Sequence, residues 1–98
     1  GIPVSVARAA SLLTLLFERF TERTPAAIAS ASRDTAMAYY NAEGISNGDR
    51  AYAAYIVANA HVALGNASEA LGWAQTAVRL APNVRAYQAL LNGLSGRP

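Results

Sequence analysis

A short alanine-rich stretch between two turn signals most strongly limits what this chain can fold into. It covers residues 63–83 and reads ALGNASEALGWAQTAVRLAPN. Ala70, Ala74 and Ala77 are spaced by four and three residues, which places them on one face of a helix. Alanine strongly favours a helix, and side chains this small let a second helix approach closely. The stretch therefore predicts a helix whose alanine face packs against a neighbouring helix.

The ends of this helix are marked by specific residues. Gly65 lies where the preceding helix needs a left-handed residue to end. Asn66 followed by Glu69 three residues later has the spacing of a capping box, with Asn in the Ser/Thr role. Pro82 cannot continue a helix, so the chain must turn there. These signals predict a helix over residues 67–81.

Similar signals divide the rest of the chain. Thr24-Pro25 separates two apolar segments, Asn47-Gly48 is typical of a turn, and Asp49 and Asn83 are placed to cap the helices that follow them. No run of alternating polar and apolar residues predicts a strand. We therefore expect one all-α domain over residues 1–98, with antiparallel neighbours because the connections are short. The predicted helices cover residues 4–23, 25–43, 50–64, 67–81 and 84–94.

Residues 51–84 resemble a tetratricopeptide repeat (TPR), whose unit is 34 residues long. The matching residues are those of the inter-helix turn, the two small positions of the second helix and the closing Leu and Pro: Leu64, Gly65, Asn66, Ala70, Ala77, Leu80 and Pro82. The first helix departs from the family, because Ala54, Val57, Ala58 and His61 stand where the family has Trp, Leu, Gly and Tyr. Ala74 stands at the second-helix aromatic position, with Trp73 one place earlier.

The resemblance implies a fragment of a right-handed α-solenoid. Residues 4–43 would form a degenerate helix pair before the clear repeat, and residues 84–94 a closing helix. An unrelated array of α-helical hairpins would carry the same Ala, Gly and Pro signals and is the alternative.

Charge and composition argue against several classes of function. All eight basic residues are arginines spread along the chain, and the net charge is +2, so no basic stripe predicts nucleic-acid binding. Residues 4–17 are the most apolar stretch, but they are too few for a membrane span and include Arg8. The lack of cysteine leaves the compartment open, with the cytoplasm favoured over a secreted or periplasmic location. Arginine without lysine, together with abundant alanine, is typical of a GC-rich bacterial genome.

The sequence offers no catalytic or metal-binding set. His61 is the single histidine and shares a helix face with Ala54 and Val57, which indicates a core or boundary position. It has no second histidine or cysteine with which to bind a metal, and no nucleophile motif or phosphate-binding glycine loop is present. We therefore expect a protein that is not an enzyme and has no metal or cofactor.

The tyrosines of the third predicted helix form the candidate binding surface. Tyr52, Tyr55 and Asn59 recur at helical spacing, Val62 continues the same face, and Tyr87 and Gln88 extend it from the last helix. In the resembled family this face of each first helix lines a concave peptide-binding groove. The resemblance therefore implies a scaffold, adaptor or chaperone that binds a protein or peptide partner. In the alternative interpretation, Tyr52 and Tyr55 pack on the second helix near Tyr39 and Tyr40.

The first predicted helix indicates a second contact. Leu15 falls within its polar arc and Leu12 on the edge of that arc, so the helix is apolar on more than one side. A homodimer, a neighbouring repeat or a partner protein would cover these leucines. A self-associating structural domain that dimerises through this helix is the alternative function.

Overall fold

The computed structural model describes residues 26–96, and the regular structure in this range is helical. Its helices are α2 (Ala26–Tyr40), α3 (Asn47–Ala63), α4 (Ala67–Leu80) and α5 (Arg85–Leu94). The predicted all-α class is confirmed for this range, whereas the helix predicted over residues 4–23 lies outside the described residues. None of these four helices is long and apolar enough to cross a membrane.

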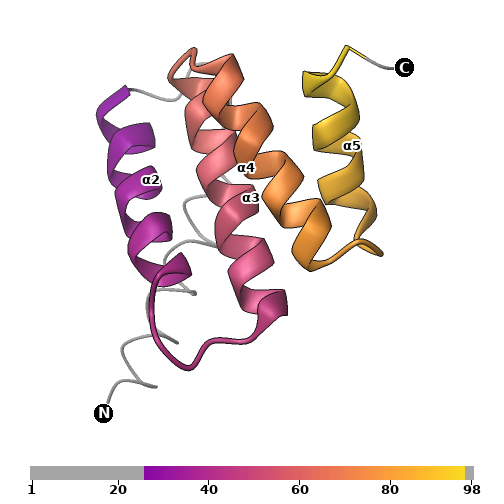
Figure 1. The fold of residues 1–98 in the computed structure, drawn as a ribbon. Coiled ribbons are helices and arrows are strands. Elements are labelled where there is room, and N and C mark those ends of the chain that lie inside the picture. Colours follow the sequence, from indigo (N-terminus) through magenta and orange to yellow (C-terminus); the bar gives the residue numbers. More distant parts are fainter. Residues whose placement is uncertain (1–25, 97–98) are drawn as a thin grey trace.

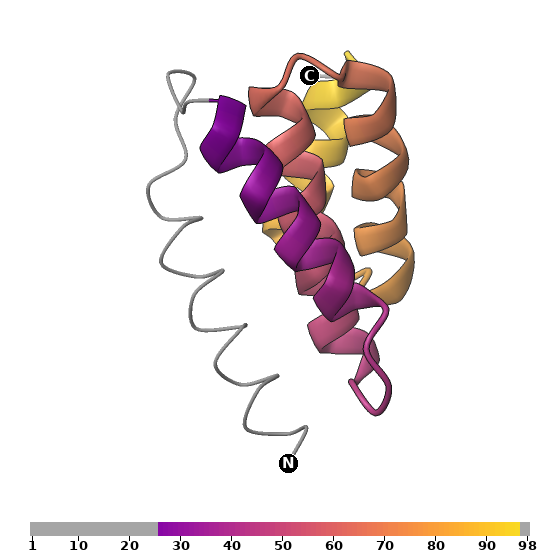
Figure 2. The same cartoon turned by 90° about the vertical axis from the view of Figure 1, so that its left-hand side faces the viewer.

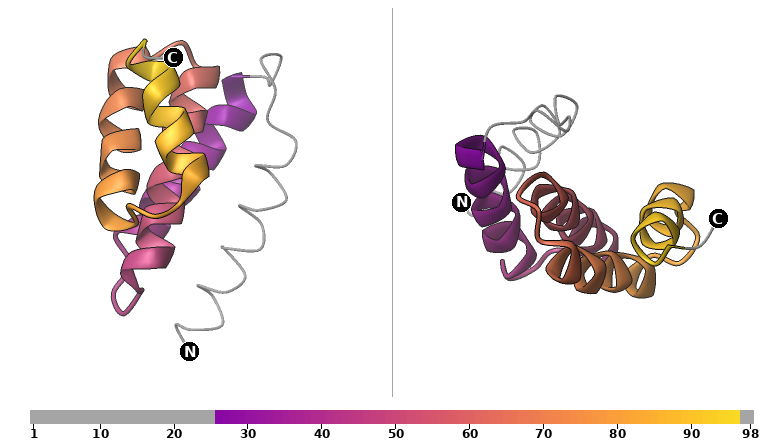
Figure 3. Two further views of the ribbon diagram at one scale, coloured as in Figure 1. Left: turned by 90° about the vertical axis from the view of Figure 1, so that its right-hand side faces the viewer. Right: turned by 90° about the horizontal axis from the view of Figure 1, so that it is seen from above.

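Consecutive helices run antiparallel and lie side by side (Figure 1). α3 packs extensively against both α2 and α4, and α4 packs against α5. The view from the side of α2 shows that helix crossing in front of α3 (Figure 2). Seen from above, the four helices form a curved row from α2 to α5 (Figure 3). α3 therefore holds the central place in the described part of the chain.

The start of α3 corrects one prediction. The helix begins at Asn47 and is capped by Ser46, whose Oγ accepts a hydrogen bond from the backbone N–H of Asp49 at 3.1 Å. Ser46 has the extended backbone (φ −73°, ψ 163°) that an N-cap residue needs. Asp49 is therefore not the cap, and Asn47-Gly48 lies in the first helical turn, because the serine hydroxyl satisfies the amide three residues later.

The end of α3 follows the prediction. Gly65 has φ +79°, the left-handed conformation that favours glycine. Its N–H donates to the carbonyl of Val62 at 3.1 Å, and the N–H of Asn66 donates to the carbonyl of His61 at 2.8 Å. These two bonds form a Schellman motif, which satisfies carbonyls that the helix end would leave unpaired.

The predicted side-chain caps of the last two helices are not formed. Asn66 holds the N-cap position of α4 as predicted, but its side chain makes no capping hydrogen bond and its backbone (φ −98°, ψ 71°) is not that of a typical cap. The N-cap residue of α5 is Val84, again without a side-chain cap, so Asn83 does not hold that position. α2 ends at Tyr40, before the predicted residue 43. There the N–H of Ala42 donates to the carbonyl of Tyr39, three residues earlier, so the α-helical bonding to the fourth preceding residue stops.

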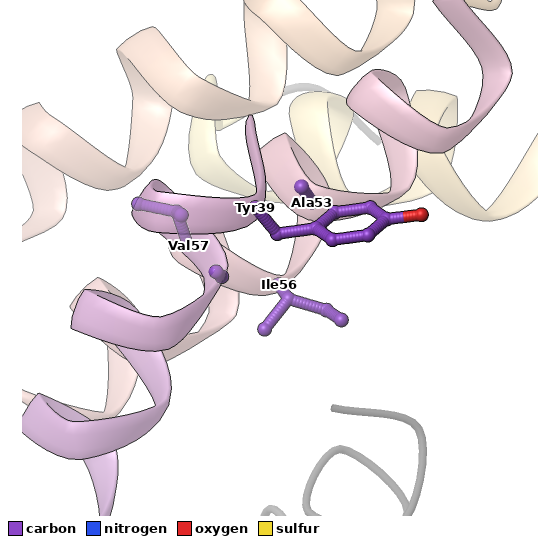
Figure 4. Close-up of a cluster of buried hydrophobic side chains, with 5 residues drawn as sticks. Tyr39, Ala53, Ile56 and Val57 are labelled. Atoms are coloured by element: carbon purple, nitrogen blue, oxygen red, sulfur yellow. The ribbon is translucent and has the colours of Figure 1, made fainter. Parts of the chain in front are cut away.

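The core between α2 and α3 combines alanines with larger apolar side chains. Ala36, Tyr39, Ala53, Ile56 and Val57 form one buried cluster (Figure 4). Ile56 and Val57 are the largest fully buried side chains in the described range. Alanines at the contact let the helix axes approach closely, so each large side chain fills the space beside them.

The alanine face of α4 is buried as predicted. Ala70, Ala74 and Ala77 have no exposed surface. Ala77 packs with Ala51 and Tyr87 in a second buried cluster, which joins α4 to both α3 and α5. The small residues of the opening stretch therefore form the seam of the α3–α4 hairpin.

Two aromatic pairs connect helices that are not consecutive. Tyr40 of α2 meets Trp73 of α4 edge to face, with ring centroids 5.2 Å apart and an interplanar angle of 89°. Tyr55 of α3 meets Tyr87 of α5 at 4.7 Å and 40°. The guanidinium carbon of Arg50 lies 5.6 Å from the Tyr40 ring centre, within range of a cation–π contact. The aromatic pairs thus join α2 to α4 and α3 to α5, in addition to the packing between consecutive helices.

Candidate functional site

The candidate site is the strip of α3 that holds Tyr52, Tyr55, Asn59 and Val62, referred to below as the tyrosine face. Spacings of three and four residues place these side chains within one arc of the helix. The buried residues of α3 occupy the rest of its circumference: Ala51, Ala53, Ala54, Ile56, Val57, Ala58, Ala60 and His61. Val62 is 46% exposed, and the other three residues of the face are partly buried. The tyrosine face is therefore the less buried side of α3.

Each tyrosine of this face also contributes to packing. Tyr52 packs at the edge of the buried α2–α3 cluster that contains Tyr39, as the alternative interpretation of the sequence expected. Tyr55 instead stacks on Tyr87, which is only 8% exposed. The structure thus places Tyr87 behind the face, where it supports Tyr55, and brings α5 to the margin of the tyrosine face.

The amide side chains beside the face bind the backbone of their own segment. Asn59 Nδ2 donates to the carbonyl of Tyr55 at 2.9 Å. Gln88 is exposed, and its Nε2 donates to the carbonyl of Pro82 in the turn before α5. The Asn59 side chain is therefore held against the tyrosine face. Gln88 instead stabilises the α4–α5 turn, which lies beside the face.

Burial changes the acidity of these phenols. It raises the pKa of Tyr55, where the Asn59 side chain acts in the opposite direction and the nearby Tyr52 adds to the rise. Burial also raises the pKa of Tyr87, with further contributions from Tyr52 and Tyr55. Tyr55 and Tyr87 thus stay neutral at physiological pH, so each keeps an uncharged hydroxyl group beside its aromatic ring.

A second polar cluster lies where α3 turns into α4. His61 is 5% exposed, and its Nδ1 lies 3.2 Å from Glu69 Oε2 and 3.3 Å from Asn66 Nδ2. The predicted core or boundary position of His61 is confirmed. The predicted capping box is wrong, because Asn66 and Glu69 direct their side chains to the histidine ring.

Sequence reasoning missed this cluster. Helix-face arguments treat His61 as part of α3 and Glu69 as part of α4, so the contact across the turn does not show as a pattern on either helix. A buried histidine followed eight residues later by a carboxylate, with a Gly-Asn turn between them, is the signal that could have found it.

The structure adds no metal site to these two clusters. No group of three or more His, Cys, Asp or Glu residues within residues 26–96 could hold a metal ion. Leu12 and Leu15, the predicted second interface, lie outside the described residues. No family model, curated protein or solved structure matches the chain.

Proposed function

We propose that this protein is a TPR-like interaction module whose tyrosine face binds a protein partner, presented as a peptide or a helix. The observation that carries the proposal is the uneven burial of α3. This helix is fully buried around most of its circumference, and its less buried strip holds Tyr52, Tyr55, Asn59 and the exposed Val62. Tyrosine is favoured at protein interfaces because it combines a large apolar ring with a hydrogen-bonding hydroxyl group.

The packing behind the face supports this role. Tyr55 rests on the buried ring of Tyr87, and Asn59 is bonded to the backbone of Tyr55. Side chains held in this way lose little conformational freedom when a partner binds, which favours affinity. α3 and α5 lie on the same side of the curved row (Figure 3) and are joined by the Tyr55–Tyr87 contact, so a partner on that side would meet both helices. An adaptor, scaffold or chaperone would use such a surface in a helix-in-groove or extended-peptide mode.

Site-specific photocrosslinking tests the proposal. A photoreactive residue at Val62, which is exposed, is expected to crosslink a partner that mass spectrometry identifies. The matched control carries the same residue at Gln75, an exposed position on α4. Equal crosslinking from both positions would contradict the assignment of the face. Crosslinks that join two copies of this chain would support the self-associating alternative.

Substitution of the face provides the quantitative test. Tyr52→Ala combined with Asn59→Ala is expected to weaken binding of the identified partner about tenfold or more. Gln75→Ala with Arg79→Ala, two exposed positions on α4, is the control and should leave binding unchanged. Circular dichroism and urea unfolding establish that both double variants are folded. Unchanged affinity in a folded Tyr52/Asn59 variant would overturn the proposal.

A further inference from the structure

The histidine ring at the α3–α4 turn has two hydrogen-bonding partners for one atom. His61 is the single histidine of the sequence, and it is buried at the end of α3. The amide Nδ2 of Asn66 lies 3.3 Å from its Nδ1, and Oε2 of Glu69 lies 3.2 Å from the same nitrogen. Both distances are within reach of a hydrogen bond.

These two bonds require opposite states of Nδ1. The amide nitrogen of Asn66 is a donor, so it needs the lone pair of an unprotonated Nδ1. The carboxylate of Glu69 is an acceptor, so it needs a proton on Nδ1. A single ring nitrogen cannot accept from one group and donate to the other at the same time.

We propose that His61 exchanges hydrogen-bond partners with its protonation state, which makes the α3–α4 turn responsive to pH. The neutral ring, with its proton on Nε2, accepts the hydrogen bond of Asn66 through Nδ1. The protonated ring donates from Nδ1 to Glu69 and forms an ion pair with it. Histidine side chains ordinarily change charge between about pH 5 and 8, and glutamate carboxylates are ordinarily ionised through most of that range.

Glu69 is the charged group that meets this ring among the residues that the structure describes. On α2, Arg33 and Asp34 pair with each other at 3.1 Å. The remaining charged side chains of the packed helices lie elsewhere: Asp49 and Arg50 at the start of α3, Arg79 in the last turn of α4 and Arg85 at the start of α5. The charge on His61 therefore acts mainly on Glu69.

The backbone of the turn limits the size of the effect. The N–H of Asn66 donates to the carbonyl of His61 in the Schellman motif, and this bond does not depend on the ring proton. Protonation thus changes the side-chain partner while the turn stays closed. The Glu69 side chain is 64% exposed, so solvent screens the ion pair. We expect the His61–Glu69 pair to change the unfolding equilibrium constant by about two- to fivefold.

Nuclear magnetic resonance of the full chain tests the exchange directly. Long-range proton–nitrogen spectra distinguish the Nδ1–H and Nε2–H forms, and a single histidine makes the signals unambiguous. At about pH 8 the ring is expected to carry its proton on Nε2. In Asn66→Ala the neutral ring should shift toward the Nδ1–H form, bonded to Glu69. A wild-type ring that is mainly Nδ1–H at high pH would overturn the proposal.

Glu69→Gln tests the protonated state. In this variant the Nδ1–H signal of the protonated ring is expected to shift relative to the wild type, because a neutral amide cannot form the ion pair with Nδ1. Glu43→Gln removes the same charge from an exposed position before α3 and is the control. A double-mutant cycle with His61→Gln should show the two- to fivefold coupling at about pH 5.5 and less at pH 8. An Nδ1–H signal that is the same in both charge variants, or coupling that does not change with pH, would contradict the proposal.

Discussion

The rings of Tyr55 and Tyr87 lie 4.7 Å apart at an angle of 40°, and this contact joins α3 to α5 although α4 separates them along the chain. Tyr87 is the buried residue of α5. This aromatic pair therefore adds to the packing of α5 on α4 in setting the position of α5, and with it the margin of the tyrosine face.

Tyr87→Ala is expected to lower the free energy of unfolding by about 3 kcal/mol, because it removes a buried ring and leaves a cavity. Urea unfolding followed by circular dichroism measures this loss. A double-mutant cycle with Tyr55→Ala should give a coupling of about 0.5–1.5 kcal/mol, the range for paired aromatic rings. Additive losses would show that the two rings do not stabilise each other.

Ala74→Leu is expected to destabilise the protein by about 1–3 kcal/mol, because the α3–α4 seam has no room for a larger side chain. Ala74 has no exposed surface. The same substitution at Ala89, an exposed position in α5, is the control and should change the midpoint of thermal unfolding little. If both variants unfold at the wild-type temperature, the close approach of α3 and α4 is not a packing constraint.

Two glycines should respond to alanine in opposite directions. Gly72 lies in α4 with open space where a Cβ atom would stand, so Gly72→Ala is expected to stabilise the helix by about 0.5–1 kcal/mol. Gly65 has φ +79°, so Gly65→Ala should destabilise by about 1–2 kcal/mol even though space is available. Thermal unfolding of both variants checks the sign. Equal effects at the two positions would contradict the role of Gly65 as the left-handed end of α3.

Stability is expected to fall at alkaline pH because several tyrosines are harder to ionise in the folded protein. Burial raises the pKa of Tyr39, and the charge and hydrogen bond of Asp49 raise it further; the pKa of Tyr55 and Tyr87 is also raised. A raised pKa in the folded state stabilises the fold below the unfolded pKa of about 10. This contribution is lost as the pH rises through the folded pKa.

Urea midpoints measured from about pH 8 to pH 11 test this dependence. Tyr39→Phe removes an ionisable group from the core, so its stability should decline less steeply with pH than that of the wild type. Absorbance of the phenolate gives the titration itself. A wild-type midpoint that stays constant over this range would contradict the expected sign.

Ser46→Ala is expected to cost about 1 kcal/mol, because the N–H of Asp49 would lose its hydrogen-bond acceptor. Ser46→Asn, which retains a capping oxygen, should restore most of the stability. Chemical unfolding of the two variants separates the cap from other effects of the position. A fully stable Ser46→Ala variant would show that the serine does not hold the start of α3.

Much of the helical pattern could be predicted because glycine, proline and alanine act over a few residues. Gly65 ends α3 through its own backbone freedom, and Pro82 ends α4 because it lacks an N–H. Helix geometry places Ala70, Ala74 and Ala77 on one face of α4, and this is the face that is buried. Local chemistry therefore determines where these helices end and which face of α4 is buried.

The caps and the pairings could not be predicted in the same way. Ser46 and Asp49 both suit a helix start, and the choice between them depends on where the first turn closes. Asn66 and Glu69 have the spacing of a capping box, but the ring of His61 across the turn provides a competing partner. The arc of the tyrosine face was predictable from spacing, whereas the stacking of Tyr55 on Tyr87 depends on how α5 folds back.

The order of the helices in the row also has a kinetic consequence. The extensive contacts join α2 to α3, α3 to α4 and α4 to α5, so each forms between segments that are neighbours along the chain. Only short loops need to close before these contacts form, and such local topologies fold quickly. Tyr40–Trp73 and Tyr55–Tyr87 reach across one intervening helix and would be completed after the hairpins that bring them together. The described part of the chain can thus assemble by successive addition of helices, with α3 as the segment on which the others are built.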